Sequence, residues 1–584
     1  MTVKDDVSSG AAAALPRRTS RSQGDSLAET AAQSGIGLVC LALVAIPLVP
    51  LILQAFSAVP LYAWDGAFTL ANFSNLFSLP EIPGLATVTL VFCLISIGFS
   101  LIFGTVLALL VGRTNLPSRG FFANILLWPI FVSPLIIGFG AILTYGPSGY
   151  VSALFVNLFG GEAPWNIYTV TGLSLISGIA MVPMTILYCL SSAQQQDPRL
   201  EAAARIAGAG PLRIVTRITL PLMRPAIVYG FVMNVVAALE MFAIPLLLGG
   251  PVGIQLITTF IYDKGFEAGR PDYGLVSAAA LILLVLVSLL VALQHVLLAR
   301  AHRFISIGPK GGRLEPLDLG RWRWPAFGAV LLYVGLTIGA LGFGLLLRSF
   351  VTVLSPFISP FEVLTFENYR ETFMNGTYAR SILNTILLAV GGGFLGTLII
   401  GALAFVAQRS EFRFRRLVDL LAQLPRAVPG LIVSLGVFYA IVLVPGFGFL
   451  AGTLWVLALA YIIRHLPAGY GIVAPAMLQV TRDFDRAARV VGASWSQTVR
   501  RIVAPILKPA FLSCYTLLVI LFFKEYAAAI FLYRPGNEVI SMAMLSAWVP
   551  GYTGVVASLS VIQIAITALL IFIATRLFGV KLHG

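Results

Sequence analysis

The sequence predicts an all-α polytopic membrane protein of about 12 transmembrane helices, arranged as two fused six-helix repeats. Composition gives the first indication, because 58% of the 584 residues are hydrophobic and only 11% are charged, whereas soluble domains are about 25% charged. The apolar residues form long continuous runs, which disordered chains and the alternating strands of transmembrane β-barrels lack. An internal repeat gives the third indication, since segments 284 residues apart share one sequence pattern.

Twelve runs are long enough to cross a bilayer, which requires about 20 mostly apolar residues in a helix. The runs of the first half are residues 35–56, 87–112, 121–145, 168–190, 226–249 and 274–299. The runs of the second half are residues 325–347, 381–407, 417–444, 451–471, 510–533 and 555–578. Each half therefore crosses the membrane six times, and the two halves have the same orientation.

The basic residues predict which side faces the cytoplasm. With a cytoplasmic N-terminus, 29 lysine and arginine residues fall in the inside segments and six fall outside, as the positive-inside rule requires. The C-terminus is then cytoplasmic as well, and the net charge of +14 marks the inner face rather than a nucleic-acid partner. The predicted organisation is a disordered cytoplasmic tail (1–34), a first six-helix half (35–300), a basic cytoplasmic linker (301–324) and a second six-helix half (325–584).

No pattern in the chain predicts catalysis, a bound metal or a cofactor. The four cysteines lie singly within apolar runs, as buried thiols do, and the four histidines form no ligand cluster. The sequence contains no G-x-x-x-x-G-K-[ST] phosphate loop, and no nucleophile–base arrangement stands out. We therefore expect a protein that is not an enzyme and does not hydrolyse ATP by itself.

The most similar repeat segments are residues 201–226 and 485–510, which align without a gap and are identical at 11 of 26 positions. Each contains an acidic residue, an Ala-Ala-Arg stretch that favours helix, a glycine that can end the helix, and a later Ile-x-x-Pro where the chain re-enters the membrane. This spacing predicts a helix–turn–helix on the cytoplasmic surface of each half. The key positions are Glu201, Ala203, Arg205, Gly208, Ile218 and Pro221 in the first segment, and Asp485, Ala487, Arg489, Gly492, Ile502 and Pro505 in the second.

These two segments resemble the EAA coupling loops of ABC importer permeases, in which each loop docks into a groove of an ATPase subunit. The resemblance covers nearly the whole chain. The two-half layout and the Leu-Pro-Arg-Ala-Val-Pro-Gly sequence at 424–430 are similar to those of the ferric-iron transport permease family. One departure is that the glutamate of the EAA pattern aligns with Ala202 and Arg486, so that the acidic residues stand one position earlier.

The resemblance implies a permease subunit of the bacterial inner membrane that imports its substrate by alternating access. Two copies of an ATP-binding subunit, carrying ATP and magnesium, would dock on loops 196–225 and 480–509, and a periplasmic substrate-binding protein would deliver the substrate. Ferric iron is the leading substrate, and thiamine, polyamine, phosphonate and sulfate are the alternatives.

Two other interpretations compete with an importer permease. Major-facilitator secondary transporters also have two six-helix halves, but their characteristic basic loop follows the second span of a half, and segment 113–119 is short and lacks that pattern. The repeated segments could alternatively be basic stretches that bind anionic lipid headgroups, which would not require the Gly–Ile–Pro spacing twice.

Several polar residues fall within the predicted spans, where Arg, Lys or Asp costs about 2.5–3.5 kcal/mol on insertion scales. We interpret them as a substrate pathway or gate, and the alternative is a structural ion pair, either Glu240–Lys524 or Lys524–Glu525. Arg464 would favour an anionic passenger or pair with a carboxylate. Carboxylate and phenolate oxygens suit ferric iron and suit an organic cation equally well. The predicted pathway set comprises the polar residues Glu240, Arg464, Lys524, Glu525 and Tyr526, together with Met241.

Overall fold

The structure, a computed structural model, describes most of the chain. It covers residues 23–577 except for 64–65, 268–270, 302–315, 354–357, 359–361, 444–445 and 482. Every regular element in these residues is a helix, and the β-pairing among them is limited to three isolated bridges. Within the described ranges, nine helices are long and apolar enough to cross a membrane, or up to 13 if each bent pair counts as one span. The predicted all-α polytopic fold is confirmed.

The described helices fall on the twelve predicted runs. The first half uses α1 (Gln23–Ala55), α3 (Ile82–Arg113), α4 with α5 (Arg119–Leu127 and Pro134–Tyr145), α7 (Val170–Gln194), α11 (Arg224–Leu239) and α14 (Tyr273–Ala301). The second half uses α15 with α16 (Arg323–Val334 and Ala340–Ser349), α18 with α19 (Gly376–Leu387 and Gly393–Arg409), α20 with α21 (Arg415–Gln423 and Gly430–Leu443), α22 (Leu454–Gln479), α26 (Lys508–Phe523) and α28 (Thr553–Leu577). The duplication is therefore visible helix by helix.

Four of the predicted runs are not continuous helices. In run 121–145 the 3-10 turn η2 (Trp128–Phe131) separates α4 from α5, and in run 417–444 the turn η11 (Leu424–Ala427) separates α20 from α21, with a bend of 110°. Prolines flank both breaks and cannot donate a backbone hydrogen bond. In the other two runs, α11 stops at Leu239 and the short helix α12 (Ala243–Gly249) follows it, and α26 stops at Phe523.

The boundaries of the tail and of the linker coincide only in part with the helices. Helix α1 begins at Gln23, inside the segment that the sequence assigns to a disordered tail, and the side chain of Gln33 donates to Glu29 one turn earlier, at 3.2 Å. Residues 1–22 lie outside the described residues, as do residues 302–315 of the linker.

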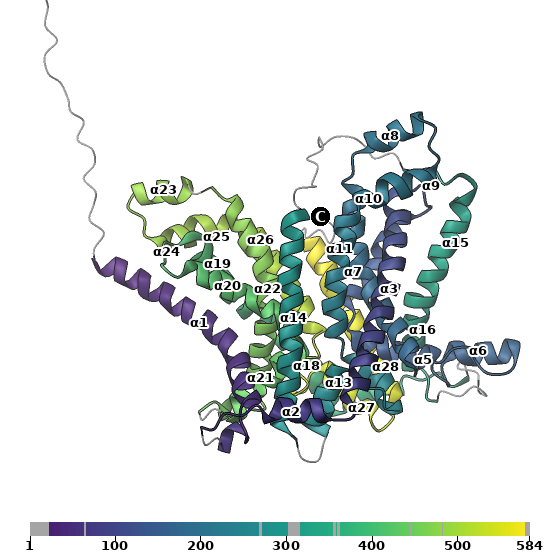
Figure 1. Ribbon diagram of the computed structural model, residues 1–584, viewed down its shortest axis with the longest axis horizontal. Helices are drawn as coiled ribbons and strands as arrows, with labels where there is room; N and C mark the ends of the chain where they lie inside the picture. The colour runs from purple at the N-terminus through teal and green to yellow at the C-terminus, as the bar shows by residue number, and fades with distance from the viewer. Residues whose placement is uncertain are drawn as a thin grey trace, which may run out of the picture.

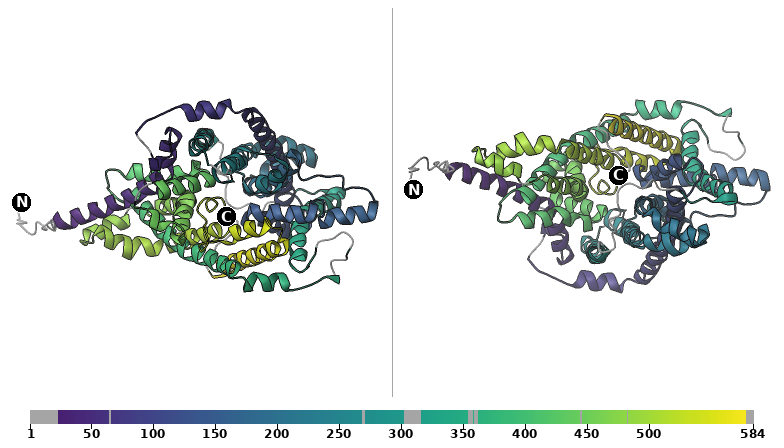
Figure 2. Two further views of the ribbon diagram at one scale, coloured as in Figure 1. Left: turned by 90° about the horizontal axis from the view of Figure 1, so that it is seen from below. Right: turned by 90° about the horizontal axis from the view of Figure 1, so that it is seen from above.

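The first helix of each half packs against the other half. Helix α1 lies along α21, and α16 lies along α5; Figure 2 shows α1 beside helices of the second half. Gly436 of α21 and Gly140 of α5 are repeat equivalents, and each marks a close approach. A Cβ on Gly436 would overlap the carbonyl oxygen of Pro47, and one on Gly140 would lie 3.3 Å from that of Leu341. The two halves are thus interleaved.

The first half also carries an extra helix on its longer external loop. Helix α6 (Tyr150–Phe159) lies within residues 146–167, between α5 and α7. It projects sideways from the bundle (Figures 1 and 2). The first turn of α6 is held to the bundle by Trp165, whose indole N–H donates to the carbonyl of Tyr145 at 3.2 Å and to the hydroxyl of Ser152 at 3.1 Å.

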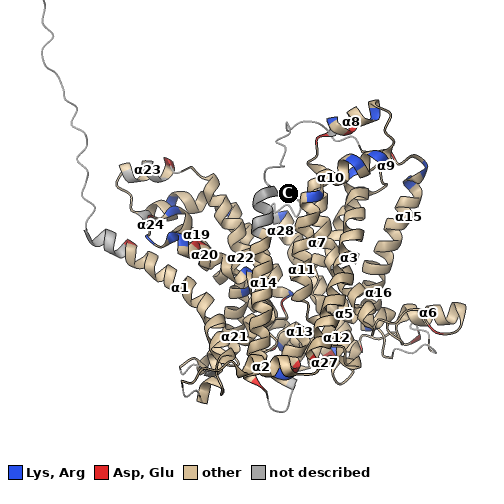
Figure 3. Ribbon diagram, viewed as in Figure 1, with Lys and Arg blue, Asp and Glu red and all other residues tan. Residues whose placement is uncertain are grey.

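The two repeated loop segments lie at the same end of the bundle. Helices α8 (Pro198–Ile206) and α9 (Pro211–Ile214) belong to the first loop, and α23 (Asp483–Val490) and α24 (Trp495–Thr498) belong to the second. Figure 1 shows both loops at one end, separated by the helices between them. Figure 3 shows that lysine and arginine residues gather at this same end. The charge asymmetry read from the sequence is therefore an asymmetry of the folded bundle.

Candidate functional site

A polar cluster lies where the two halves meet, at two equivalent helix ends. Helix α11 ends at Leu239 and α26 ends at Phe523, positions related by the repeat offset of 284 residues. Glu240 directly follows the first end, and Lys524 follows the second. Because the backbone leaves the helix here, these side chains project from a break in the middle of a predicted span rather than from a regular helical face.

Glu240 pairs with a residue of the opposite half. Its carboxylate forms an ion pair with the guanidinium of Arg464 on α22, and the two side chains are 14% and 22% exposed. Arg464 also donates to the carbonyl oxygen of Val428, at 2.7 Å. The sequence left open whether Arg464 pairs with a carboxylate, and in the structure it does.

Lys524 does not form the ion pair with Glu240 that the sequence left open as an alternative to a pathway role. The ammonium of Lys524 instead donates to the carbonyl oxygen of Ile130 in η2, at 2.5 Å, and so also joins the two halves. In a continuous helix that carbonyl would accept from the residue four positions later, which is Pro134 and has no N–H. Lysine therefore satisfies an acceptor that proline leaves free, which matters because an unsatisfied carbonyl is costly inside a membrane.

The other pairing that the sequence left open, Lys524 with Glu525, is not the contact that the Glu525 carboxylate makes. The carboxylate of Glu525 contacts Nε2 of His465 at 2.7 Å and accepts the backbone N–H groups of Tyr526 and Ala528, both at 3.1 Å. Glu525 therefore caps the turn that follows α26 and is anchored to α22 by histidine. Among the described residues, no group of three or more His, Cys, Asp or Glu side chains is placed to hold a metal ion.

Aromatic rings extend the contact between the halves. The ring of Phe242 stacks on that of Tyr526, with centroids 6.4 Å apart and planes 8° apart. Met241 is buried, and its carbonyl accepts the hydroxyl of Thr258 at 2.7 Å. The six predicted pathway residues thus lie in one region, and Phe242 and His465 join them. Phe242 could have been found from the sequence, because the repeat offset aligns it with Tyr526.

The coupling segments have the predicted helix–turn–helix form in both halves. Gly208 follows α8 with φ of 80°, and Gly492 follows α23 with φ of 81°, a conformation that glycine adopts without strain. After each glycine, the next backbone N–H bonds to a carbonyl five residues back, from Ala209 at 2.9 Å and from Ala493 at 3.0 Å. Both helices therefore end in the same C-terminal motif.

The predicted coupling residues differ in exposure. Ala203, Arg205, Gly208, Ala487, Gly492 and Pro505 are exposed, Ile218, Pro221 and Ile502 are half-buried, and Glu201 is buried. Asp485 and Arg489 lie on α23, and their side chains are outside the described residues. The exposed positions form the outer surface of each loop.

Large apolar side chains on both loops point into solvent, which the sequence pattern did not single out. Ile206 and Val490 occupy equivalent positions after the offset of 284 and are 89% and 84% exposed. Leu200 and Phe484 form a second equivalent pair, and both are also exposed. The two loops therefore present apolar side chains to solvent at matching positions.

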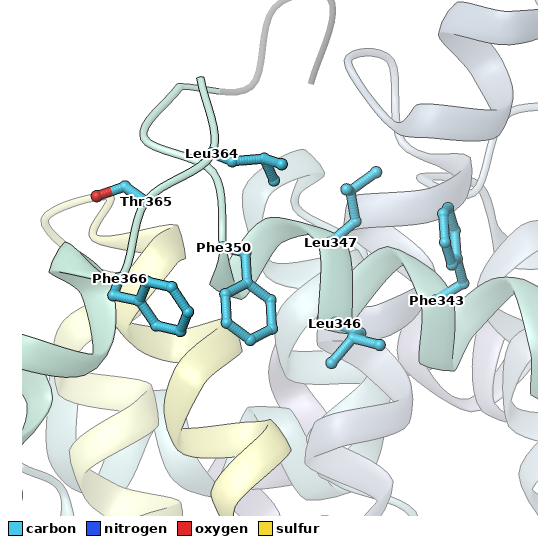
Figure 4. Close-up of a pocket in the computed structure, with 7 residues that line it drawn as sticks. All are labelled: Phe343, Leu346, Leu347, Phe350, Leu364, Thr365 and Phe366. Atoms are coloured by element: carbon cyan, nitrogen blue, oxygen red, sulfur yellow. The ribbon is translucent and has the colours of Figure 1, made fainter. Parts of the chain in front are cut away.

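An apolar pocket lies elsewhere, at the end of the bundle away from the loops. It has a volume of about 380 Å³ and is shown in Figure 4. Its lining is Phe343, Leu346, Leu347, Phe350, Leu364, Thr365 and Phe366. None of the predicted site residues contributes to it, so it is separate from the polar cluster.

Comparisons with known proteins agree with the duplicated fold. Residues 96–303 and 397–580 match the family described as "Binding-protein-dependent transport system inner membrane component". A ferric transport system permease protein FbpB of Actinobacillus pleuropneumoniae is 25% identical over 76% of this chain and 64% of its own length. A putative ferric transport system permease protein of Haemophilus influenzae is 26% identical over 70% of this chain and 64% of its own length.

A shorter relative matches about one third of the chain. The sulfate transport system permease protein CysW of Synechocystis is 26% identical over 34% of this chain and 72% of its own length. The chain thus spans 64% of the length of each of the two ferric permease relatives. Because the family match covers most of both halves, the chain belongs to the family of binding-protein-dependent transport system inner membrane components.

Proposed function

We propose that this chain is the membrane-spanning permease of an ATP-driven importer that receives its substrate from a binding protein. The observation that carries the proposal is the pair of coupling segments, each with a glycine-terminated helix and an exposed apolar residue at the same repeat position. A pair of equivalent docking surfaces at one end of a duplicated bundle suits two copies of one partner. The partner is an ATPase subunit, which holds ATP and magnesium and docks on loops 196–225 and 480–509.

The polar cluster acts as the gate of this permease. In the described arrangement the ion pair between Glu240 and Arg464, and the hydrogen bond from Lys524 to Ile130, both cross from one half to the other. Opening a passage between the halves separates these partners. The charges then face the passage, where they contact the substrate or water in place of each other.

Ferric iron is the proposed substrate. Two of the relatives that match 70% or more of this chain are named as ferric transport permeases, and Glu240, Glu525 and Tyr526 offer the oxygen groups that hard cations prefer. The same oxygens suit thiamine or a polyamine. Phosphonate and sulfate are the anionic alternatives; Arg464 and Lys524 favour them, and the Synechocystis relative is named as a sulfate permease.

The location and orientation of the helix bundle follow from the same function. The bundle sits in the bacterial inner membrane, with the basic end that carries the coupling loops, the N-terminus and the C-terminus on the cytoplasmic side. The opposite end receives the periplasmic substrate-binding protein.

Reconstitution tests this function directly. The full chain is placed in proteoliposomes with its ATPase subunits inside and the binding protein outside, and uptake of radiolabelled ferric iron is measured. We expect uptake to require ATP, the ATPase subunits and the binding protein. Competition by unlabelled thiamine, polyamine, phosphonate or sulfate identifies an alternative substrate.

The same vesicles also test the rival function. Uptake by the chain alone, driven by an ion gradient in the absence of any ATPase subunit, would refute the importer and favour a twelve-helix secondary transporter.

A further inference from the structure

A buried ion pair ties the first coupling helix to a membrane-spanning helix. The guanidinium of Arg113, the last residue of α3, contacts the carboxylate of Glu201 on α8, and the two side chains are only 1% and 3% exposed. The hydroxyl of Thr219 donates to the same carboxylate at 3.0 Å. Both charged groups are therefore removed from water, and the carboxylate of Glu201 is held by Arg113 and Thr219.

The two sides of α8 have different surroundings. Ile206 is almost fully exposed, whereas Glu201 faces Arg113 and is covered. A side chain that is 3% exposed cannot form the contact surface for another protein without unfolding the loop. Glu201 therefore contacts residues within the chain, and Ile206 is available to a partner.

The linker between the halves is attached at the same point. The backbone N–H of Leu317 donates to the carbonyl of Arg113 at 2.7 Å, and the amide of Asn115 donates to Asp318 at 2.5 Å. The hydrogen bond from the backbone N–H of Gly320 lowers the pKa of the Asp318 carboxyl below its usual value, and the hydrogen bond from the Asn115 amide lowers it further. The Asp318 carboxylate is therefore charged at neutral pH. The chain therefore enters the second half from a position fixed beside the ion pair.

The second half places an arginine at the equivalent position. Arg409 ends α19 and is also buried, and it donates to the carbonyl of Met477 at 2.7 Å and to that of Val480. These carbonyls belong to the end of α22 and the residue that follows it, immediately before the second coupling segment. In both halves, an arginine at the end of the second span thus binds the chain in or next to the coupling loop, through an ion pair in the first half and through backbone carbonyls in the second.

We propose that Arg113, acting through Glu201, is the positioning residue that transmits movement of the first coupling loop into α3, and that Arg409 performs this role beside the second loop. The inference rests on the proposed importer function and adds the route by which a docked ATPase subunit moves the spans. A buried ion pair suits this role because removing one partner leaves an uncompensated charge away from water. The loop and the span therefore move as one body.

The test compares one substitution on each side of α8, made in the full chain and assembled with its ATPase subunits. Glu201→Gln removes the inward charge, and Ile206→Asp on the same helix is the matched outward variant. We expect Ile206→Asp to abolish co-purification of the ATPase subunits. We expect Glu201→Gln to keep the complex and its ATP hydrolysis while uptake per ATP hydrolysed falls about tenfold, within the range of coupling free energies between sites. The exchange of Arg113→Glu with Glu201→Arg should restore part of the loss.

Several results would overturn the proposal. If Glu201→Gln loses the ATPase subunits as Ile206→Asp does, the carboxylate belongs to the docking surface. Unchanged uptake per ATP would show that the ion pair serves packing alone. Failure of the importer itself is distinguishable, because uptake would then persist without any ATPase subunit and Ile206→Asp would have no effect.

A second measurement applies if Glu201→Gln does not fold. The milder variant Arg113→Lys keeps the charge but loses the planar contact with the carboxylate. We expect faster amide hydrogen exchange in α8 and unchanged exchange in α3. Equal exchange of α8 in the variant and the native chain would refute the attachment.

Discussion

The interleaving of the halves can be tested at Gly436, where α1 and α21 approach most closely. A methyl group at this position would overlap the carbonyl oxygen of Pro47. That atom belongs to the backbone, so the conflict is relieved only if α1 moves away by about 1 Å, and overpacking of this kind costs about 1–3 kcal/mol or more. We therefore expect Gly436→Ala to destabilise the chain by about 2–3 kcal/mol.

Two matched controls accompany this variant. Gly140→Ala is the repeat equivalent, and its Cβ would meet atoms of Leu341 and Leu345 at 3.3 Å, which small shifts can accommodate. Gly98→Ala lies within α3 with no atom in its way, so it should be neutral or stabilising by about 0.5–1 kcal/mol. The three variants are ranked by thermal stability: each is heated in detergent, and the fraction that remains folded is measured by size-exclusion chromatography.

The expected order of stability is Gly98→Ala above Gly140→Ala above Gly436→Ala. A Gly436→Ala protein as stable as Gly140→Ala would refute the close packing of α1 on α21. In that case the interleaved arrangement of the halves would lose its main support.

Two further predictions concern the polar cluster. Glu240→Gln should reduce uptake more than expression, because it leaves the charge of Arg464 without its partner in the closed gate; an unchanged uptake rate measured in proteoliposomes would contradict this role. Lys524→Met should lower thermal stability by about 1–3 kcal/mol, because the Ile130 carbonyl loses its donor. Adding Pro134→Ala should recover part of that loss by supplying a backbone N–H, and a double variant no more stable than Lys524→Met would refute the explanation.

Local features were predictable from the sequence. The glycines at 208 and 492 end their helices as expected, because the backbone conformation there is decided by residues close in the chain. The twelve apolar runs coincide with helices for the same reason. The breaks in two of these runs carried a signal too, since Pro129 and Pro134 stand beside one of them and Pro425 and Pro429 beside the other.

Partner choice within the polar cluster was not predictable in the same way. Repeat alignment makes Glu240 and Lys524 equivalent, but equivalent positions in two halves need not contact each other. Lys524 donates to the carbonyl oxygen of Ile130, which Pro134 cannot pair because proline has no backbone N–H. Glu240 then meets Arg464, which the first half does not duplicate, since its equivalent is Ala180.

The packing of α1 against α21 sets a requirement on how the chain is made. Gly436 is synthesised 389 residues after Pro47, which at about 5–20 residues per second is a delay of roughly 20–80 seconds. During this interval α1 is in the bilayer without the surface on which it finally rests. An 18-residue window within Glu29–Ala55 has a mean hydropathy of 2.9, high enough for lipid alone to hold the helix while the ribosome completes the rest of the bundle.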